Sequence, residues 1–472
     1  MGDLADELLR NVEEAGARAQ SALFEPVLRL GVTGLSRAGK TVFITSLVAN
    51  LLDRGRMPQL LAASSGAIRT AYLQPQPDDT VPRFDYETHL AALTGPTPHW
   101  PQSTRAVSQL RLSLKVQPTG LLAGWGGPRV VHLDIVDYPG EWLLDLPLLD
   151  QSYGEWSEHA LALAAGDGRA EYAEGWQQAL AKAEPDAPFD EATAQGLATA
   201  FTDYLRRARA AGFSDCTPGR FLLPGEMEGS PVLTFAPLPG GGTGKRGSLA
   251  REMARRFAAY KAQVVRPFFR DHFARIDRQI VLVDALGAIH SGPRAVEDLR
   301  LAMRDVLRAF RPGRNTWLSR LTGRKVDRIL FAATKADHLH HSQHPRLTAI
   351  MEALLRDARD RADFAGARTA AMSIAALRAT VEETHDHQGR KLDCVRGTLL
   401  ETGRSAAFYP GALPDDPAAL LAPAKQGAAQ WLEADYQIMR FQPARLSLKP
   451  QDGPPHIRLD KAAEFLFGDR LQ

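Results

Sequence analysis

The most constraining feature of this chain is a glycine-rich octapeptide at residues 34–41, GLSRAGKT, which matches the pattern G-x-x-x-x-G-K-[ST] at every fixed position. An apolar run, Val27–Thr33, precedes it, and an apolar helical pattern, Val42–Leu52, follows it. Between a strand and a helix, such a loop binds phosphate through backbone N–H groups and the positive end of the helix dipole. A glycine-rich turn before a core helix is the alternative, but the flanking elements favour a phosphate-binding loop (P-loop).

The positions of this loop have distinct expected roles. Lys40 neutralises the β- and γ-phosphates, and the Thr41 hydroxyl is placed to bind Mg²⁺. The residues predicted to contact the nucleotide at this end are Ser36, Arg37, Ala38, Gly39, Lys40, Thr41 and Val42. A second glycine-rich stretch, residues 240–245, lacks the first glycine and the final Ser or Thr of the pattern, so we interpret it as a surface loop.

Composition places the chain among ordinary globular proteins. It has 472 residues, 44% apolar and 24% charged, so we expect one large elaborated domain or two to three smaller ones. The formal net charge of +2 gives no reason to expect nucleic acid as the main partner. Two cysteines, Cys216 and Cys394, provide no disulfide framework or zinc cluster and suit a reducing compartment. No apolar run is long enough to cross a bilayer and residues 1–22 lack a secretory signal, so we expect a soluble, cytoplasmic protein.

Short apolar runs separated by helical stretches predict an α/β fold with crossover helices. The predicted strands are Val27–Thr33, Val107–Val116, Val130–Val136, Gln279–Val283, Arg328–Ala333 and Thr369–Ser373. A Gly-rich segment joins the second and third, so we expect a mixed, mostly parallel sheet with one antiparallel strand. Residues 53–104 are rich in Pro and aromatic residues, and we expect mostly loop there with a short helix at Tyr86–Leu93.

The chain divides into five predicted segments. Residues 1–24 are predicted to form an amphipathic helix, and residues 25–144 the first part of the nucleotide-binding domain. Residues 145–275 carry helical patterns and are too long for a loop, which predicts a large, mainly helical insertion. Residues 276–410 are expected to complete the nucleotide-binding domain, and residues 411–472 to form a C-terminal extension packed on it.

An acidic residue closes the predicted strand that follows the Gly-rich segment. Asp137 begins the sequence DYPG, and a carboxylate buried at a strand end is costly unless a cation or a donor accompanies it. We therefore predict that Asp137 holds Mg²⁺ through water and that the Gly140 backbone N–H senses the γ-phosphate. The pattern D-x-x-G is common alone, but after a P-loop and a strand it indicates a GTPase motif.

The base-reading motif is predicted at Thr334–Asp337, TKAD, directly after a strand. The Asp337 carboxylate can accept hydrogen bonds from the N1–H and the exocyclic amine of guanine, and adenine offers no matching donor pair. The aliphatic stem of Lys335 can cover the base plane. A plain strand-to-loop Lys/Asp pair is the alternative. A weaker element of the same site, predicted from its position alone, is the run Ser373, Ile374 and Ala375.

Catalytic residues are harder to assign than binding residues. Glu141 stands where many GTPases place a Gln that orients water, and a carboxylate there also repels the γ-phosphate, so we predict slow turnover. The alternative is that Glu141 turns away and pairs with an arginine. Thr104 is predicted to complete the Mg²⁺ and γ-phosphate site, although an ordinary surface Thr is nearly as good an interpretation. Arg37 and Arg105 are the candidates for positive charge at the transition state.

Two further groups of charged residues are interpreted structurally. The histidines at positions 338, 340, 341 and 344 are interpreted as a solvated face rather than a metal site, because the sequence specifies no ligand geometry. Basic and aromatic residues interleave over residues 251–270, where amphipathic packing against the nucleotide-binding domain is favoured over a membrane or partner surface.

Several stretches together resemble the YcjX-like family of bacterial P-loop proteins, from about Glu25 to Leu471. They are residues 37–41, 74–79, 82–84, 100–105, 137–142, 266–284, 311–315 and 331–340. The resemblance implies a Ras-like G domain with helical additions, GTP and GDP binding, and a stress-associated role under heat-shock control. It also implies a genomic association with a membrane protein. We therefore expect an unidentified protein partner, with membrane-associated proteins among the candidates, at most peripheral membrane contact, and no nucleic acid.

The leading prediction is a Mg²⁺-dependent GTP hydrolase that acts as a two-state switch. One alternative is a non-hydrolysing guanine-nucleotide sensor that recruits a partner, and Glu141 keeps this alternative open. A second is an ATPase or another ATP-driven enzyme such as a small-molecule kinase, against which Asp337 argues. Turnover separates the first two predictions, and base preference separates the third.

Overall fold

The computed structural model describes most of the chain. The described residues are 25–34, 38–102, 106–117, 127–166, 168–213, 215–241, 244–309, 326–364, 367–431 and 436–471. The predicted N-terminal helix at residues 1–24 lies outside this part of the chain, as do Ser36, Arg37, Thr104 and Arg105.

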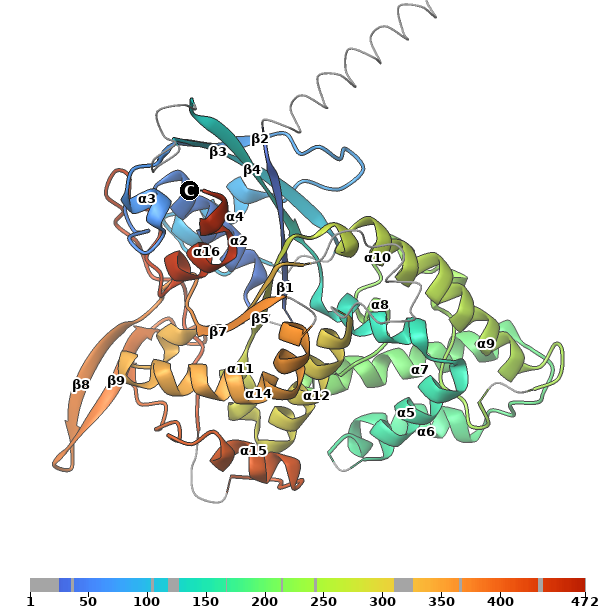
Figure 1. Ribbon diagram of the computed structural model, residues 1–472. Coiled ribbons are helices and arrows are strands. Elements are labelled where there is room, and N and C mark those ends of the chain that lie inside the picture. Colours follow the sequence, from blue (N-terminus) through green and yellow to red (C-terminus); the bar gives the residue numbers. More distant parts are fainter. Residues whose placement is uncertain are drawn as a thin grey trace, which may run out of the picture.

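A seven-stranded sheet forms the centre of the molecule, in the order β2-β3-β4-β1-β5-β6-β7 (Figure 1). Its strands are β1 (Val27–Gly34), β2 (Ile68–Gln74), β3 (Ser108–Val116), β4 (Arg129–Asp137), β5 (Arg278–Val283), β6 (Arg328–Ala333) and β7 (Arg368–Ser373). Strand β3 runs antiparallel to both of its neighbours, and the remaining pairs are parallel. The mixed, mostly parallel sheet with one antiparallel strand is therefore confirmed.

The edge strand β2 was not expected from the sequence. The stretch between residues 53 and 104 was predicted as mostly loop with one short helix, and it holds α3 (Leu61–Ser64), β2 and α4 (Tyr86–Thr94). Only Ile68 is fully buried in β2, so this strand carries no apolar run that a sequence pattern could reveal. Backbone pairing with β3 makes it a strand, and the expectation of loop there was wrong.

Helices cover both faces of the sheet. The side chains of β5, which alternate between two apolar cores, show why. Ile280 and Leu282 pack in one core with helices α2 (Lys40–Leu52) and α16 (Leu459–Phe467). Val281 and Val283 pack in another core with α11 (Ala285–Ser291), α12 (Pro293–Ala309) and α14 (His344–Phe364). Successive side chains of a strand point to opposite faces, so this fully buried strand needs cover on both sides.

A group of helices follows β4 and lies to one side of the sheet (Figure 1). It begins with a 3₁₀ stretch, Gly140–Asp150, and continues through α5 (Tyr153–Ala165), α6 (Ala170–Ala181), α7 (Glu191–Ala210), α8 (Gly219–Leu222), α9 (Leu249–Tyr260) and α10 (Arg266–Asp271). Trp156 stacks on Phe257 with ring centroids 5.0 Å apart. The aromatic residues of α9 therefore pack among these helices themselves. The large helical insertion is present, while the exact domain boundaries stay a prediction.

A small antiparallel sheet lies beyond β7 and projects away from the helical insertion (Figure 1). It consists of β8 (Val381–His387), β9 (Arg390–Thr398) and β10 (Ser405–Phe408). Gln388 and Gly389 join the first two strands, and both have positive φ, 52° and 75°. A two-residue hairpin turn with positive φ at both positions matches the twist of the strands it connects. Because β8 is mostly polar, no apolar pattern in the sequence indicates this hairpin.

The C-terminal stretch returns to the sheet. It contains α15 (Ala418–Lys425), and α16 packs against β5 and β6. Among the described helices, none combines the length and apolarity needed to cross a lipid bilayer.

Candidate functional site

The P-loop stands between β1 and α2, as predicted. Gly39 immediately precedes α2 with φ of 82°, a left-handed conformation that glycine adopts without strain. Lys40 is the first residue of the helix, and its Nζ donates a hydrogen bond to the Gly34 carbonyl at 3.3 Å. The lysine therefore folds back across the start of its own loop, at the end of the helix that favours anions.

Asp137 ends β4 beside the P-loop strand. In the parallel register it lies opposite Val32 of β1, and its side chain is 1% exposed. Thr41, at the start of α2, is also buried. A carboxylate and a hydroxyl are the hard oxygen ligands that suit Mg²⁺, so these residues fit the ion that a P-loop implies.

The predicted base-reading motif, Thr334–Asp337, follows β6. Lys335 has a left-handed backbone with φ of 60°, and its Nζ forms an ion pair with the carboxylate of Asp284, the residue between β5 and α11. Asp337 is buried, and its Oδ2 accepts a hydrogen bond from the Ala379 N–H at 2.9 Å. The Thr380 hydroxyl donates to the Asp337 carbonyl. The segment before β8 therefore holds the aspartate in place, which the sequence did not indicate.

A cavity of about 350 Å³ joins the two ends of this site. The predicted residues that line it are Ala38, Gly39, Lys40, Thr41, Val42, Lys335, Asp337, Ile374 and Ala375. Its volume lies within the range typical of small-molecule sites, about 300–1,000 Å³. Ser373 does not line the cavity: its hydroxyl donates to the His344 carbonyl at 3.1 Å, and the chain enters the cavity wall one residue later.

Residues that the sequence did not single out as binding residues complete the cavity wall. Trp100 comes from the segment before β3, and its Nε1 donates to the Phe441 carbonyl at 2.7 Å. The Phe441 ring meets the His338 ring edge-on, with centroids 5.2 Å apart. Burial lowers the pKa of His338, so this wall presents a neutral aromatic surface. Trp100 and Phe441 are 341 positions apart, a pairing that no local pattern indicates.

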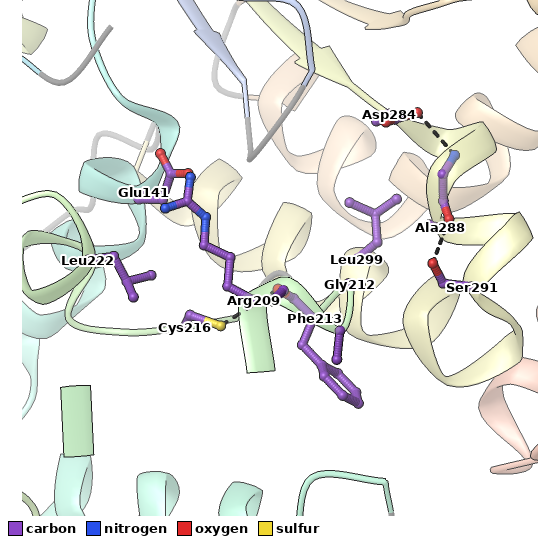
Figure 2. A pocket seen from close by; sticks show the side chains of 13 residues that line it. Glu141, Arg209, Gly212, Phe213, Cys216, Leu222, Asp284, Ala288, Ser291 and Leu299 are labelled. Carbon is purple, nitrogen blue, oxygen red and sulfur yellow. Dashed lines mark hydrogen bonds and ion pairs between the residues drawn. The ribbon is translucent and has the colours of Figure 1, made fainter. Parts of the chain in front are cut away.

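Glu141 lies elsewhere, in contact with the helical insertion. Figure 2 shows Arg209 of α7 reaching its carboxylate, with Nη2 2.6 Å from Oε1. The two side chains border a second cavity of about 170 Å³, whose opposite wall includes Asp284. In this structure, therefore, Glu141 pairs with an arginine, the alternative to orienting water that its sequence position allows. Gly140 precedes it at the start of the 3₁₀ stretch.

The Glu141–Arg209 pair predicts a measurable coupling. Arg209→Met leaves a nearly buried carboxylate without its cation, and we expect a loss of stability of about 2 kcal/mol. This value lies below the cost of breaking a fully buried pair, about 3–5 kcal/mol, because the Arg209 side chain is 26% exposed. Denaturant unfolding of Arg209→Met, Glu141→Gln and the double variant measures the coupling, and additive effects would contradict it.

Asp145 ties the same 3₁₀ stretch to two helices of the insertion. Its Oδ2 accepts from the Tyr260 hydroxyl at 2.6 Å, and its Oδ1 accepts from the Gly219 N–H at 2.8 Å. Burial raises the pKa of this carboxyl to about 6 from its ordinary value of 3.8. Between these two values the native state holds a proton that the unfolded chain has released, so stability falls as the pH rises through this window.

Replacing Asp145 by Asn tests this pH dependence. The amide stays neutral at every pH, so the free energy of unfolding of the wild type, relative to Asp145→Asn, should fall by about 2 kcal/mol between pH 4 and pH 7. Denaturant titrations of both proteins across this range give the difference directly. Parallel pH profiles would show that Asp145 ionises normally.

Comparisons with known proteins agree with this architecture. The model of the YcjX-like family, DUF463, matches residues 28–471. "Ras-like GTPase YcjX" of Escherichia coli (strain K12) is 40% identical over 458 residues, which cover 94% of this chain and 96% of that protein. The protein of the same name from Shewanella oneidensis is 35% identical over 469 residues, with 94% and 95% covered. The predicted Ras-like P-loop fold with a helical insertion is thereby confirmed, and the chain belongs to the YcjX-like family.

Proposed function

We propose that this protein binds guanine nucleotides with Mg²⁺ and hydrolyses GTP slowly, as a two-state switch. The observation that carries the proposal is the single cavity that joins the P-loop residues to Asp337. Phosphates placed at Lys40 and the start of α2 leave the base at the other end, beside the buried carboxylate. The names of the two relatives, both Ras-like GTPases, support the same assignment.

Base selection is assigned to Asp337. Its carboxylate is held by the Ala379 N–H on one oxygen, which fixes its orientation before a nucleotide arrives. Guanine offers two N–H donors to a carboxylate, and adenine would leave the buried charge without them. Lys335 is drawn toward Asp284, which orients its aliphatic stem for contact with the base.

Mg²⁺ is assigned to Thr41 and Asp137, joined by Thr104 in the triphosphate state. When bound, the ion neutralises charge on the β- and γ-phosphates. The chain's own contributions are Lys40, which binds the phosphates, and the Gly140 N–H, which senses the γ-phosphate. The pairing of Glu141 with Arg209 supports slow turnover, because the carboxylate must leave its partner before it can orient water.

The test uses the purified full-length protein with Mg²⁺. We expect GDP to compete with a fluorescent guanine nucleotide about a hundredfold better than ADP, since an unpaired buried charge costs a few kcal/mol. Single-turnover GTP hydrolysis should proceed on the order of 10⁻³ per second or slower, the range of GTPases without an activating arginine. Equal affinity for ADP and GDP would overturn the base assignment.

Turnover decides between the switch and the sensor. Tight GTP binding with no phosphate release over many hours would favour the non-hydrolysing sensor that recruits a partner. The protein partner itself, a membrane-associated one among the candidates, remains a proposal that rests on the family resemblance. A stress-associated role in the cytoplasm has the same basis.

A further inference from the structure

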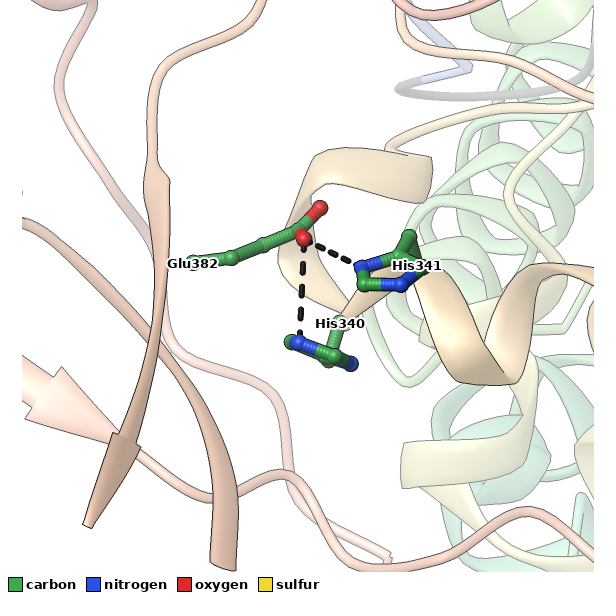
Figure 3. Close-up of side chains that lie close together, drawn as sticks. All are labelled: His340, His341 and Glu382. Atoms are coloured by element: carbon green, nitrogen blue, oxygen red, sulfur yellow. Dashed lines mark hydrogen bonds and ion pairs between the residues drawn. The ribbon is translucent and has the colours of Figure 1, made fainter.

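A cluster of side chains outside the nucleotide cavity has the composition of a metal site. Figure 3 shows His340, His341 and Glu382, whose side chains converge from two different elements. His340 and His341 follow the base-reading loop, and Glu382 is on β8, 41 positions after His341. One ligand atom from each of the three side chains lies within 4.8 Å of the other two. Only the fold brings the carboxylate to the histidines.

The distances suit a tetrahedral transition-metal ion. Glu382 Oε2 is 2.6 Å from His341 Nδ1 and 3.7 Å from His340 Nε2. Ligand atoms about 2.0–2.1 Å from a tetrahedral ion are roughly 3.3 Å apart, a value between these two distances. Small rotations of the side chains therefore bring all three ligands into position. Two imidazoles and a carboxylate form a ligand set typical of Zn²⁺, with a fourth position left for water.

A second layer of contacts orients His340, the less exposed of the two histidines. His340 Nδ1 lies 2.8 Å from Ser342 Oγ and 3.4 Å from Asp393 Oδ2, so these groups occupy the ring nitrogen that faces away from Glu382. A carboxylate behind a ligating histidine fixes the ring and raises its basicity as a ligand. Arg378 Nη2 is 3.4 Å from Glu382 Oε1, the other carboxylate oxygen, and Oε2 remains directed at the histidines.

The three side chains of the cluster differ in their exposure to solvent, and the most exposed one leaves a path by which an ion can enter. The side chain of His340 is 13% exposed, that of Glu382 21%, and that of His341 68%. The two imidazole rings lie close together, with centroids 4.2 Å apart. His341 can therefore turn onto an ion held by the other two residues without moving the backbone.

We propose that His340, His341 and Glu382 form a binding site for a divalent transition-metal ion, with Zn²⁺ the best match. The ion links the two segments that meet at Asp337. His340 lies three residues after Asp337, and Glu382 lies three residues after Ala379, whose N–H holds the Asp337 carboxylate. A bound ion therefore fixes the β8–β9 hairpin to the loop that reads the base. The site itself does not depend on the proposed function.

The test uses the untagged, full-length protein, stripped of metal and supplied with excess Mg²⁺ and GDP to occupy the nucleotide site. Calorimetry with Zn²⁺ should show one tight site per chain, and Co²⁺ should give the visible absorption of a tetrahedral complex. Both Glu382→Gln and His341→Ala should weaken the affinity at least about tenfold. Asp393→Asn should weaken it by about 10–100-fold, the usual effect of losing the carboxylate behind a ligating histidine.

The matched control is His387→Ala, an exposed histidine on the same hairpin strand that is not part of the cluster. It should bind Zn²⁺ like the wild type. Circular dichroism checks that each variant is folded. Because two ligand variants are made, the test can still be read if one of them does not fold. The proposal is overturned if the wild type binds no stoichiometric Zn²⁺, or if binding survives in both Glu382→Gln and His341→Ala.

Discussion

Replacing Lys40 by alanine is expected to slow GTP hydrolysis by on the order of a hundredfold to a thousandfold, the loss that follows removal of one group directed at transition-state charge. Lys40 stands at the first position of α2 and folds back onto the Gly34 carbonyl at 3.3 Å. A neutral carbonyl holds an ammonium more weakly than a charged acceptor does. The phosphates of a nucleotide can therefore draw the Lys40 ammonium away from the Gly34 carbonyl.

The chain supplies a matched control for that substitution. Lys245 ends the second glycine-rich stretch, which lacks the first glycine and the final hydroxyl residue of a P-loop. Lys245→Ala should leave both nucleotide affinity and hydrolysis unchanged. Single-turnover phosphate release, measured at saturating GTP for both variants, separates the two lysines. A Lys40→Ala protein with wild-type turnover would show that the phosphates bind elsewhere.

Asp337→Asn should weaken GDP binding about a hundredfold, because the change costs a few kcal/mol. The amide places an N–H donor where guanine also presents donors, so one attraction becomes a repulsion. Xanthine carries a carbonyl in place of the exocyclic amine, and an asparagine offers it one donor and one acceptor. We therefore expect the variant to bind xanthosine diphosphate more tightly than GDP, a reversal of the wild-type order.

Competition against a fluorescent nucleotide measures this reversal. Asp386→Asn, on the exposed part of β8, provides the same chemical change away from the cavity and should keep the wild-type preference. The Ala379 N–H also contacts Asp337, so the unfolding temperature without nucleotide is recorded for both variants. A folded Asp337→Asn protein with unchanged GDP affinity would exclude Asp337 as the base-reading residue.

The polar residues of the cavity could be predicted from the sequence because each group of them is a contiguous local pattern. The P-loop and the sequence TKAD are contiguous, and each follows a buried strand whose apolar run is visible in the sequence. Parallel strands end at the same edge of a sheet, so locating the strands also brought Lys40 and Asp337 to one cavity. The predicted ends of these strands agree with the structure to about one residue, because the apolar runs mark them in the sequence.

The apolar wall of the cavity could not be predicted in this way. Phe441 belongs to an irregular C-terminal segment and reaches Trp100 through a backbone carbonyl, a contact that needs no particular sequence pattern. The hairpin β8–β9 was missed because neither of its faces is a continuous apolar surface. Edge strand β2 was missed because its backbone pairing, rather than its side chains, makes it a strand.

The partner of Glu141 shows the same limit. From its position after D-x-x-G, Glu141 could either orient a water molecule or pair with an arginine. The sequence contains many arginines, so it does not indicate which one would be the partner. The cation in this structure comes from α7, 68 positions later, through the packing of the helical insertion. The sequence specifies no ligand geometry for the histidines after Asp337, and only the fold places Glu382 of the hairpin beside His340 and His341.

The sequence by itself determined the α/β sheet, the P-loop, the loop that carries Asp337 and the edge at which these loops meet, because short-range patterns of apolar and glycine residues set them. Only the tertiary structure decided the partner of Glu141, the aromatic wall of the cavity and the cluster at His340. Each of these depends on side chains tens to hundreds of positions apart. Packing free energy brings such residues together, and packing is a property of the whole chain rather than of any segment.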